Sequence, residues 1–235
     1  MSSTGQRLAE LGRRWGLDEA QLWTLSDLLA LLAADQHAPS TVRGPAAVDV
    51  HVADSLSALA LEPVRRAKSV ADLGSGAGFP GAVLAIALRQ ARVALVESAA
   101  RKCDFLERLV STLGIANARV VHARAEVWPQ GVGGHDLVVA RALAPLAVVC
   151  EYAAPLLALG GTLVAWKGEV AGVESRSGER AAEMLGLQAE GAVRSAPYAG
   201  SVAHHLHVFR KVAQTPAEYP RRPGAARKRP LGGGR

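Results

Sequence analysis

Apolar residues along this chain change from a helical spacing to strand-like runs about a quarter of the way along. Leucines recur every three or four positions over residues 8–15 and again over 22–32, which predicts two amphipathic helices. Residues 35–47 contain two prolines and a glycine and are expected to form a loop. Helical spacing returns briefly over residues 52–59. Residues 1–65 are therefore predicted to be a helical lead-in.

Beyond this point, short apolar runs alternate with helical patterns. The runs predicted as strands are SVADL (69–73), RVALVE (92–97), ARVVHA (118–123), DLVVARA (136–142) and GTLVAWK (161–167), and the later segments LQAEGAVRS (187–195) and HHLHVFRKV (204–212) suit closing strands. Helical patterns over 81–90, 101–114 and 145–160 lie between them. Buried strands that alternate with helices are typical of a doubly wound α/β fold. We predict one domain over residues 66–212 with a mostly parallel, seven-stranded sheet.

A glycine-rich turn follows the first predicted strand. The sequence VADLGSGAGFPG contains a literal G-x-G-x-x-G beginning at Gly76, the fingerprint of dinucleotide-binding folds. In those folds the first glycine opens the turn directly after the strand. Because this strand ends at Leu73, the turn opens at Gly74, and the motif in that register is D-x-G-x-G-x-G. The literal fingerprint begins at Gly76 and thus starts two residues after the position that a dinucleotide-binding fold requires.

Two acids at strand ends bear on the choice of cofactor. Asp72 would face a pyrophosphate bound over the next helix, an unfavourable like-charge contact, whereas it would attract the ammonium and sulfonium of S-adenosylmethionine. Glu97 ends the second strand, where it can accept hydrogen bonds from ribose hydroxyls in either class of cofactor. We therefore predict S-adenosylmethionine as cofactor, with contacts from Asp72, Gly74, Gly76, Gly78 and Glu97.

Basic residues are concentrated at the C-terminus. The 235 residues include 27 Lys and Arg and 21 Asp and Glu, and six of the cations follow residue 218 with no acid among them. The remainder of the chain is formally neutral. A cationic run attracts polyanions through counterion release, so we expect it to bind nucleic acid. Residues 213–235, rich in Pro, Gly and Arg, are expected to be a flexible basic tail. The candidate RNA contacts in it are Arg221, Arg222, Arg227, Lys228 and Arg229.

Other classes of protein are disfavoured by what the sequence lacks. It has no apolar run of membrane-spanning length and no signal-peptide pattern, so we expect a cytoplasmic protein without membrane contacts. Cys103 and Cys150 are too far apart in sequence for a zinc motif or a disulfide framework. His204, His205 and His207 have no acid or cysteine beside them, and no metal site is expected.

Six segments strengthen this interpretation by their order and spacing. They are DLGSGAGFPG, ESAARKCDFLERL, RAEVWP, VVARALAPL, AWKGE and EYPRRPGAARKRPL. Together they resemble the bacterial small-subunit ribosomal RNA methyltransferase G family, also called glucose-inhibited division protein B. The resemblance implies a Rossmann-like class I methyltransferase that transfers a methyl group from S-adenosylmethionine to ring nitrogen 7 of a guanine in 16S rRNA of the small ribosomal subunit. It places cofactor contacts at Gly74, Phe79, Ala125, Glu126 and Arg141.

The residues at the strand ends agree with that chemistry. Ring nitrogen 7 of guanine has a free lone pair and no proton, so its methylation needs positioning and electrostatics rather than a general base. Arg141, just past the fourth strand, is the expected positioning residue. Arg124 and Lys167 are expected phosphate contacts, and His51 with Asp54 could line the pocket. We expect a monomer.

Two further functions stay open on the sequence alone. A small-molecule methyltransferase of the same fold would not need the basic tail for turnover. A non-catalytic RNA-binding protein with a relict pocket would bind RNA but no cofactor. A nicotinamide enzyme is the most distant alternative.

Overall fold

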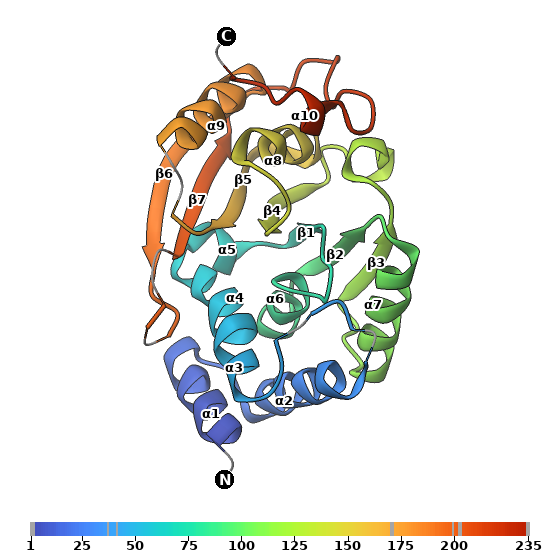
Figure 1. Cartoon of the computed structure of the whole chain (residues 1–235), viewed down its shortest axis with the longest axis vertical. Helices are drawn as coiled ribbons and strands as arrows, with labels where there is room; N and C mark the ends of the chain where they lie inside the picture. Colours follow the sequence, from blue (N-terminus) through green and yellow to red (C-terminus); the bar gives the residue numbers. More distant parts are fainter. Residues whose placement is uncertain are drawn as a thin grey trace.

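The computed structural model describes residues 3–36, 38–40, 42–169, 172–198, 200–201 and 204–233. Within these ranges, seven strands form a single sheet in the order β3-β2-β1-β4-β5-β7-β6 (Figure 1). The strands are β1 Ser69–Leu73, β2 Arg92–Glu97, β3 Ala118–His122, β4 His135–Arg141, β5 Leu157–Lys167, β6 Leu187–Ser195 and β7 His204–Lys211. Strands β1 to β5 are parallel, and β7 is antiparallel to both of its neighbours. The predicted seven-stranded, mostly parallel sheet is confirmed.

Helices cover both faces of the sheet (Figure 1). The longer ones are α1 Ser3–Trp15, α2 Glu19–Ala34, α6 Gly81–Ala87, α7 Ala100–Thr112, α8 Leu146–Ala153 and α9 Gly172–Met184. Strand residues alternate between two hydrophobic clusters, as the pleat requires. For example, Val70 belongs to the cluster that includes residues of α2, α6 and α7, whereas its neighbour Ala71 belongs to the cluster that includes residues of α8. The sheet therefore separates two cores.

The predicted helical lead-in packs onto the first of these cores. After α2 come the short helices α3 Pro45–Ala47, η1 Val48–Ala53, α4 Asp54–Leu56, η2 Ser57–Ala60 and α5 Glu62–Arg66. Leu25, Leu28 and Leu56 are fully buried, in the same cluster as α6. Asp18 and Gln21 form a reciprocal capping box that fixes where α2 begins. The lead-in brings η1 and α4 beside the end of β4.

One predicted helix is shorter than expected. The pattern over 145–160 predicted a helix throughout, but α8 ends at Ala153 and β5 begins at Leu157. Pro155 lacks an N–H and stops the helix, while the apolar run continues as a buried strand. A continuous apolar run does not by itself distinguish a strand from a buried helix.

The C-terminal segment, residues 213–233, differs from the predicted flexible tail because it is folded against the domain. It runs beside α8 and α9 and includes the short helix α10 Ala225–Lys228 (Figure 1). Arg221 pairs with the fully buried Glu151 of α8, and Ala226 is buried in the second core. A buried carboxylate requires a partner, and this segment supplies it. None of the helices in the described ranges is long and apolar enough to cross a membrane.

Candidate cofactor pocket

The turn after β1 has a conformation that glycine favours at three positions. Gly74, Gly76 and Gly78 have φ angles of 70°, 56° and 93°. The backbone N–H of Gly74 donates to the carbonyl of Val96 in β2 at 2.8 Å, which ties the turn to the neighbouring strand. A Cβ at Gly74 would lie 2.7 Å from Cδ1 of Leu143. The turn therefore needs glycine here both for its backbone angles and for the space it leaves.

Asp72 lies beneath this turn and not in the pocket above it. Its side chain is 1% exposed, and its Oδ2 accepts a hydrogen bond of 3.1 Å from the N–H of Gly81, the first residue of α6. Its Oδ1 is buried without a partner among the described residues. Burial is the main cause that raises the pKa of Asp72 to about 6. The carboxylate thus occupies the helix N-terminus, where a dinucleotide fold would bind a pyrophosphate.

Glu97 joins the turn after β1 to the turn after β2. Its Oε2 accepts from the N–H of Gly76 at 3.2 Å, and its Oε1 accepts from Ser98 and Ala99 at 2.8 and 2.9 Å. The side chain is only 7% exposed, with the Lys102 ammonium 3.9 Å away. Because its oxygens hold both turns, Glu97 shapes the floor of the site from within the protein.

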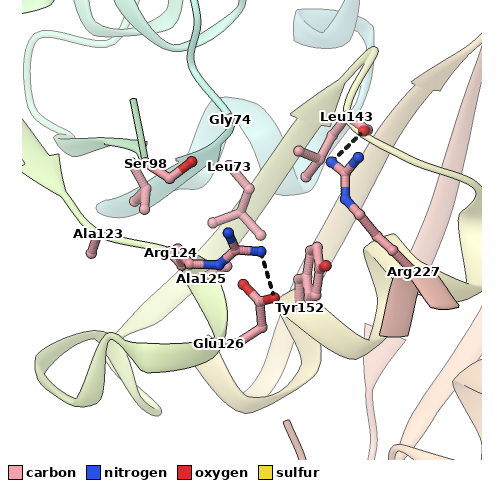
Figure 2. A pocket seen from close by; sticks show the side chains of 11 residues that line it. Leu73, Gly74, Ser98, Ala123, Arg124, Ala125, Glu126, Leu143, Tyr152 and Arg227 are labelled. Carbon is pink, nitrogen blue, oxygen red and sulfur yellow. Dashed lines mark hydrogen bonds and ion pairs between the residues drawn. The ribbon is translucent and has the colours of Figure 1, made fainter. Parts of the chain in front are cut away.

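A pocket lies above these turns, at the carboxyl ends of β1 to β4 (Figure 2). Its lining residues are Leu73, Gly74, Val96, Ser98, Ala123, Arg124, Ala125, Glu126, Leu143, Tyr152 and Arg227. Small and apolar side chains form its walls, and a few polar groups stand at its edge. Ligand pockets in open α/β sheets occur at this end of the strands, and this combination suits a flat ring with polar edges.

The polar groups of the pocket come from four separate parts of the chain, of which Ser98 follows β2. Glu126, which follows β3, accepts from the backbone N–H of Gly224 at 3.1 Å and from Nη2 of Arg124 at 3.4 Å. Burial alone would raise the pKa of Glu126, but these hydrogen bonds and the charge of Arg124 hold that pKa below its usual value. The hydroxyl of Tyr152 lies near Glu126 and Arg227 but is buried without a hydrogen bond of good geometry. A bound ligand could satisfy such a hydroxyl.

Arg141 lies outside this pocket, in contact with the helical lead-in. Its Nη1 donates to Oδ2 of Asp54 and to the carbonyl of Val50, both at 2.8 Å. Its guanidinium carbon is 5.6 Å from the centre of the Phe79 ring, and that ring stacks on His51 at 4.3 Å. The structure thus brings the predicted residues Arg141 and Phe79 together, in a cluster next to the pocket rather than in its lining.

His51 is a neutral member of this cluster at physiological pH. Burial, followed by the nearby charge of Arg141, lowers the pKa of His51 to about 4. Its Nδ1 lies 3.2 Å from Nη2 of Arg141, and its Nε2 lies 2.9 Å from Oγ of Ser40. The remaining oxygen of Asp54, Oδ1, is 3.1 Å from Nδ1 of His204. In the described part of the chain, no three His, Cys, Asp or Glu side chains group closely enough to hold a metal ion.

Two of the predicted RNA contacts, Lys167 and Arg221, each donate at least two side-chain hydrogen bonds within the protein. The Lys167 ammonium donates to the carbonyl of Ala144 at 2.9 Å and to Glu174 at 2.7 Å. Arg221 donates from Nε and Nη2 to the two carboxylate oxygens of Glu151, at 2.9 and 2.5 Å. Both side chains are therefore engaged within the protein.

The other predicted RNA contacts divide into two groups. Arg222, Lys228 and Arg229 have exposed side chains. Arg124 and Arg227 line the pocket and are also partly open to solvent (Figure 2). Two of these cations thus stand at the pocket, and the other three are exposed on the C-terminal segment.

Of the predicted cofactor residues, Gly74, Ala125 and Glu126 line the pocket, while Asp72 and Glu97 lie below it. Sequence reasoning did not name six lining residues: Ser98, Leu143, Tyr152, Leu73, Val96 and Ala123. The positions of the first two, just beyond β2 and β4, could have indicated them. Tyr152 lies within an apolar helix and carries no comparable signal.

This chain is similar in sequence to proteins of one family. The model of a family described as GidB, rRNA small subunit methyltransferase G, matches residues 21–197. A protein named ribosomal RNA small subunit methyltransferase G from Rubrobacter xylanophilus is 41% identical over 230 residues, 94% of this chain and 88% of that protein. One of the same name from a Synechococcus strain is 36% identical over 96% of this chain and 90% of its own length.

Two solved structures share the fold at low sequence identity. A TehB-like SAM-dependent methyltransferase from Corynebacterium glutamicum has a TM-score of 0.52 and 21% identity, over 69% of this chain and 89% of that one. The fibrillarin pre-rRNA processing protein of Methanococcus jannaschii also has a TM-score of 0.52, with 16% identity over 65% of this chain and 70% of its own. These similarities concern the fold alone.

Proposed function

Because this chain belongs to the rRNA small subunit methyltransferase G family, we propose that it methylates ring nitrogen 7 of a guanine in 16S rRNA. The chain is an S-adenosylmethionine-dependent methyltransferase. The identity of the methylated base and of its ring nitrogen is proposed from the resemblance of this chain's motifs to those of the family.

The structural observation that carries the proposal is the pocket over the Gly74 turn with Asp72 beneath it. The pocket is open at the carboxyl ends of β1 to β4, whereas the N-terminus of α6 is already filled by the Asp72 carboxylate. A pyrophosphate would compete with that carboxylate for the N–H of Gly81. S-adenosylmethionine contains no phosphate, so the donors present fit it better than they fit a dinucleotide.

We assign the cofactor's adenosine to this pocket. Leu73, Val96 and Leu143 supply apolar walls, and Ala125 allows a ring to approach the backbone closely. Glu126 and Ser98 are the polar groups suited to hydroxyl and amino donors. The Oδ1 of Asp72 is buried beneath the turn without a partner among the described residues, and a carboxylate there favours a cation over a phosphate above the turn. When bound, the cofactor supplies an electrophilic methyl group on a sulfonium.

The chain's part in methyl transfer is positioning. Guanine nitrogen 7 needs no general base, because its lone pair is free and it carries no proton. Arg141 stands at the end of β4 with its guanidinium fixed by Asp54 and Val50, so it presents a rigid positive charge beside the pocket. A fixed guanidinium can orient the oxygen acceptor of a guanine edge without reorganising during the reaction. We propose Arg141 as this positioning residue.

The RNA contacts that we propose are cations at the pocket edge and on the C-terminal segment. Arg222, Lys228 and Arg229 are exposed on the C-terminal segment, and Arg124 is half-exposed at the pocket edge. Neutralisation of backbone phosphates by such groups makes binding salt-dependent. We propose that the chain acts as a monomer. An rRNA substrate also supports a cytoplasmic location.

Methyl transfer from labelled S-adenosylmethionine to small ribosomal subunits tests this proposal. Subunits should come from cells that lack the gene, and naked 16S rRNA should be assayed in parallel. We expect label on one guanine of 16S rRNA, released as 7-methylguanine. Label on another base, or no label with either substrate, would reject the assignment.

A further inference from the structure

The C-terminal segment reaches the pocket at Arg227. The side chain of this residue lines the pocket on the side of Tyr152, opposite Ser98 and Ala123 (Figure 2). Its Nη2 donates to the carbonyl of Leu143 at 3.1 Å, which fixes the guanidinium beside the pocket wall. A guanidinium carries five N–H donors, so this contact leaves others for a ligand.

The position of Arg227 is fixed on both sides along the chain. Before it, Arg221 is held by two side-chain hydrogen bonds to the buried Glu151, and the N–H of Gly224 donates to Glu126. After it, the carbonyl of Leu231 accepts from Oγ of Ser177 at 3.2 Å. Burial of Ala226 next to Arg227 adds an apolar anchor in the second core. A segment anchored in this way presents Arg227 to the pocket before any RNA arrives.

The contact between Gly224 and Glu126 links the segment to the pocket directly. Glu126 lines the pocket and holds the segment with the same carboxylate. The wall made by Arg227 and the wall made by Glu126 are therefore parts of one hydrogen-bonded unit. Adenine offers ring nitrogens that accept hydrogen bonds, which match the free donors of a guanidinium.

We propose that Arg227 binds the adenosine part of S-adenosylmethionine, so that the C-terminal segment is a structural wall of the cofactor pocket. This assigns Arg227 to the cofactor instead of RNA, and it rests on the proposed use of S-adenosylmethionine. The exposed Arg222, on the same segment but not part of the pocket lining, keeps its role toward RNA.

Calorimetric titration without RNA tests the inference, with S-adenosylhomocysteine and adenosine as ligands. Loss of a hydrogen bond from a charged group weakens binding by about tenfold or more, and we expect this for Arg227→Ala with both ligands. Arg227→Lys keeps the charge but not the planar fork and should recover part of the affinity. Arg222→Ala is the matched control, and its affinity for both ligands should stay within about twofold of wild type. Thermal melting of each variant checks that the fold is intact.

The possible results separate this inference from the function on which it rests. If the wild type binds S-adenosylhomocysteine and Arg227→Ala binds it equally well, the inference is wrong and the proposed function stands. If Arg227→Ala loses affinity for 16S rRNA only, the residue is an RNA contact, which also overturns the inference. If the wild type binds no S-adenosylhomocysteine, the proposed cofactor site and the inference fall together.

Discussion

The ion pair between Arg221 and Glu151 gives the sharpest prediction about stability. Glu151 lies on α8 with its side chain 1% exposed, and the Arg221 guanidinium, 27% exposed, donates to both of its oxygens. The variant Arg221→Ala leaves the carboxylate buried, with only the backbone N–H of residue 221 as a donor at 3.1 Å. Breaking a buried pair from one side costs about 3–5 kcal/mol.

We take the lower end of that range because Arg221 is partly exposed and one donor to Glu151 remains. A loss of about 3 kcal/mol corresponds to a fall in melting temperature of about 6–12 °C for a domain of this size. Thermal unfolding followed by circular dichroism measures it. The double variant Glu151→Gln with Arg221→Leu removes both charges and keeps an acceptor for the backbone N–H, so it should recover most of the loss.

Two results would refute this reasoning. One is an Arg221→Ala protein that melts within about 1 °C of wild type, which on this scale is less than 1 kcal/mol. The other is a double variant no more stable than Arg221→Ala. The first would mean that the C-terminal segment does not depend on this pair for its position, and the second that the loss does not come from an unpaired buried charge.

Three substitutions around the glycine turn extend the test. Gly74→Ala places a methyl group 2.7 Å from Leu143 at a φ of 70°, so S-adenosylhomocysteine should bind at least about tenfold more weakly in calorimetry. Gly81→Ala places a Cβ 2.5 Å from both Asp72 and Leu95 and should destabilise the fold by about 1–3 kcal/mol in urea unfolding. Burial raises the pKa of Asp72 from 3.8 to about 6, so between these values the unfolded chain releases a proton that the folded chain keeps. Wild-type stability should therefore fall by about 2 kcal/mol relative to Asp72→Asn as the pH rises from 4 to 6, and level off above about pH 7; parallel curves would contradict this.

Strand positions followed closely from the sequence because buried parallel strands leave a simple signature. The runs 69–73 and 92–97 are the observed bounds of β1 and β2. The glycine turn was also predictable, since a left-handed backbone conformation strongly favours glycine. The choice of register at Gly74, made from the end of the first strand, agrees with the position of this glycine in the pocket lining.

The place of the C-terminal segment could not be predicted from its own composition. Proline, glycine and arginine are typical of a disordered tail. The missing signal was Glu151, an acid in the otherwise apolar run PLAVVCEYAAPLL, because a buried carboxylate requires a partner. That partner lies 70 positions further along the chain, and local patterns say nothing about contacts over such a distance.

The electrostatic role of Asp72 was predicted only in part. Its position at the strand end is as expected. The side chain, however, lies beneath the glycine turn and accepts a hydrogen bond from the N–H of Gly81 instead of facing a ligand. A pyrophosphate is still disfavoured, because the Asp72 carboxylate itself occupies the N-terminus of α6, where such an anion would bind. Likewise, the partners of Arg141 come from the helical lead-in, and only tertiary packing could identify them.

The most direct test of the account is mass spectrometry of 16S rRNA from cells with and without this gene. We expect one guanine to carry a 7-methyl group in the parent, to lose it on deletion, and to regain it when the wild-type gene is restored. An unchanged methylation pattern after deletion would contradict the account.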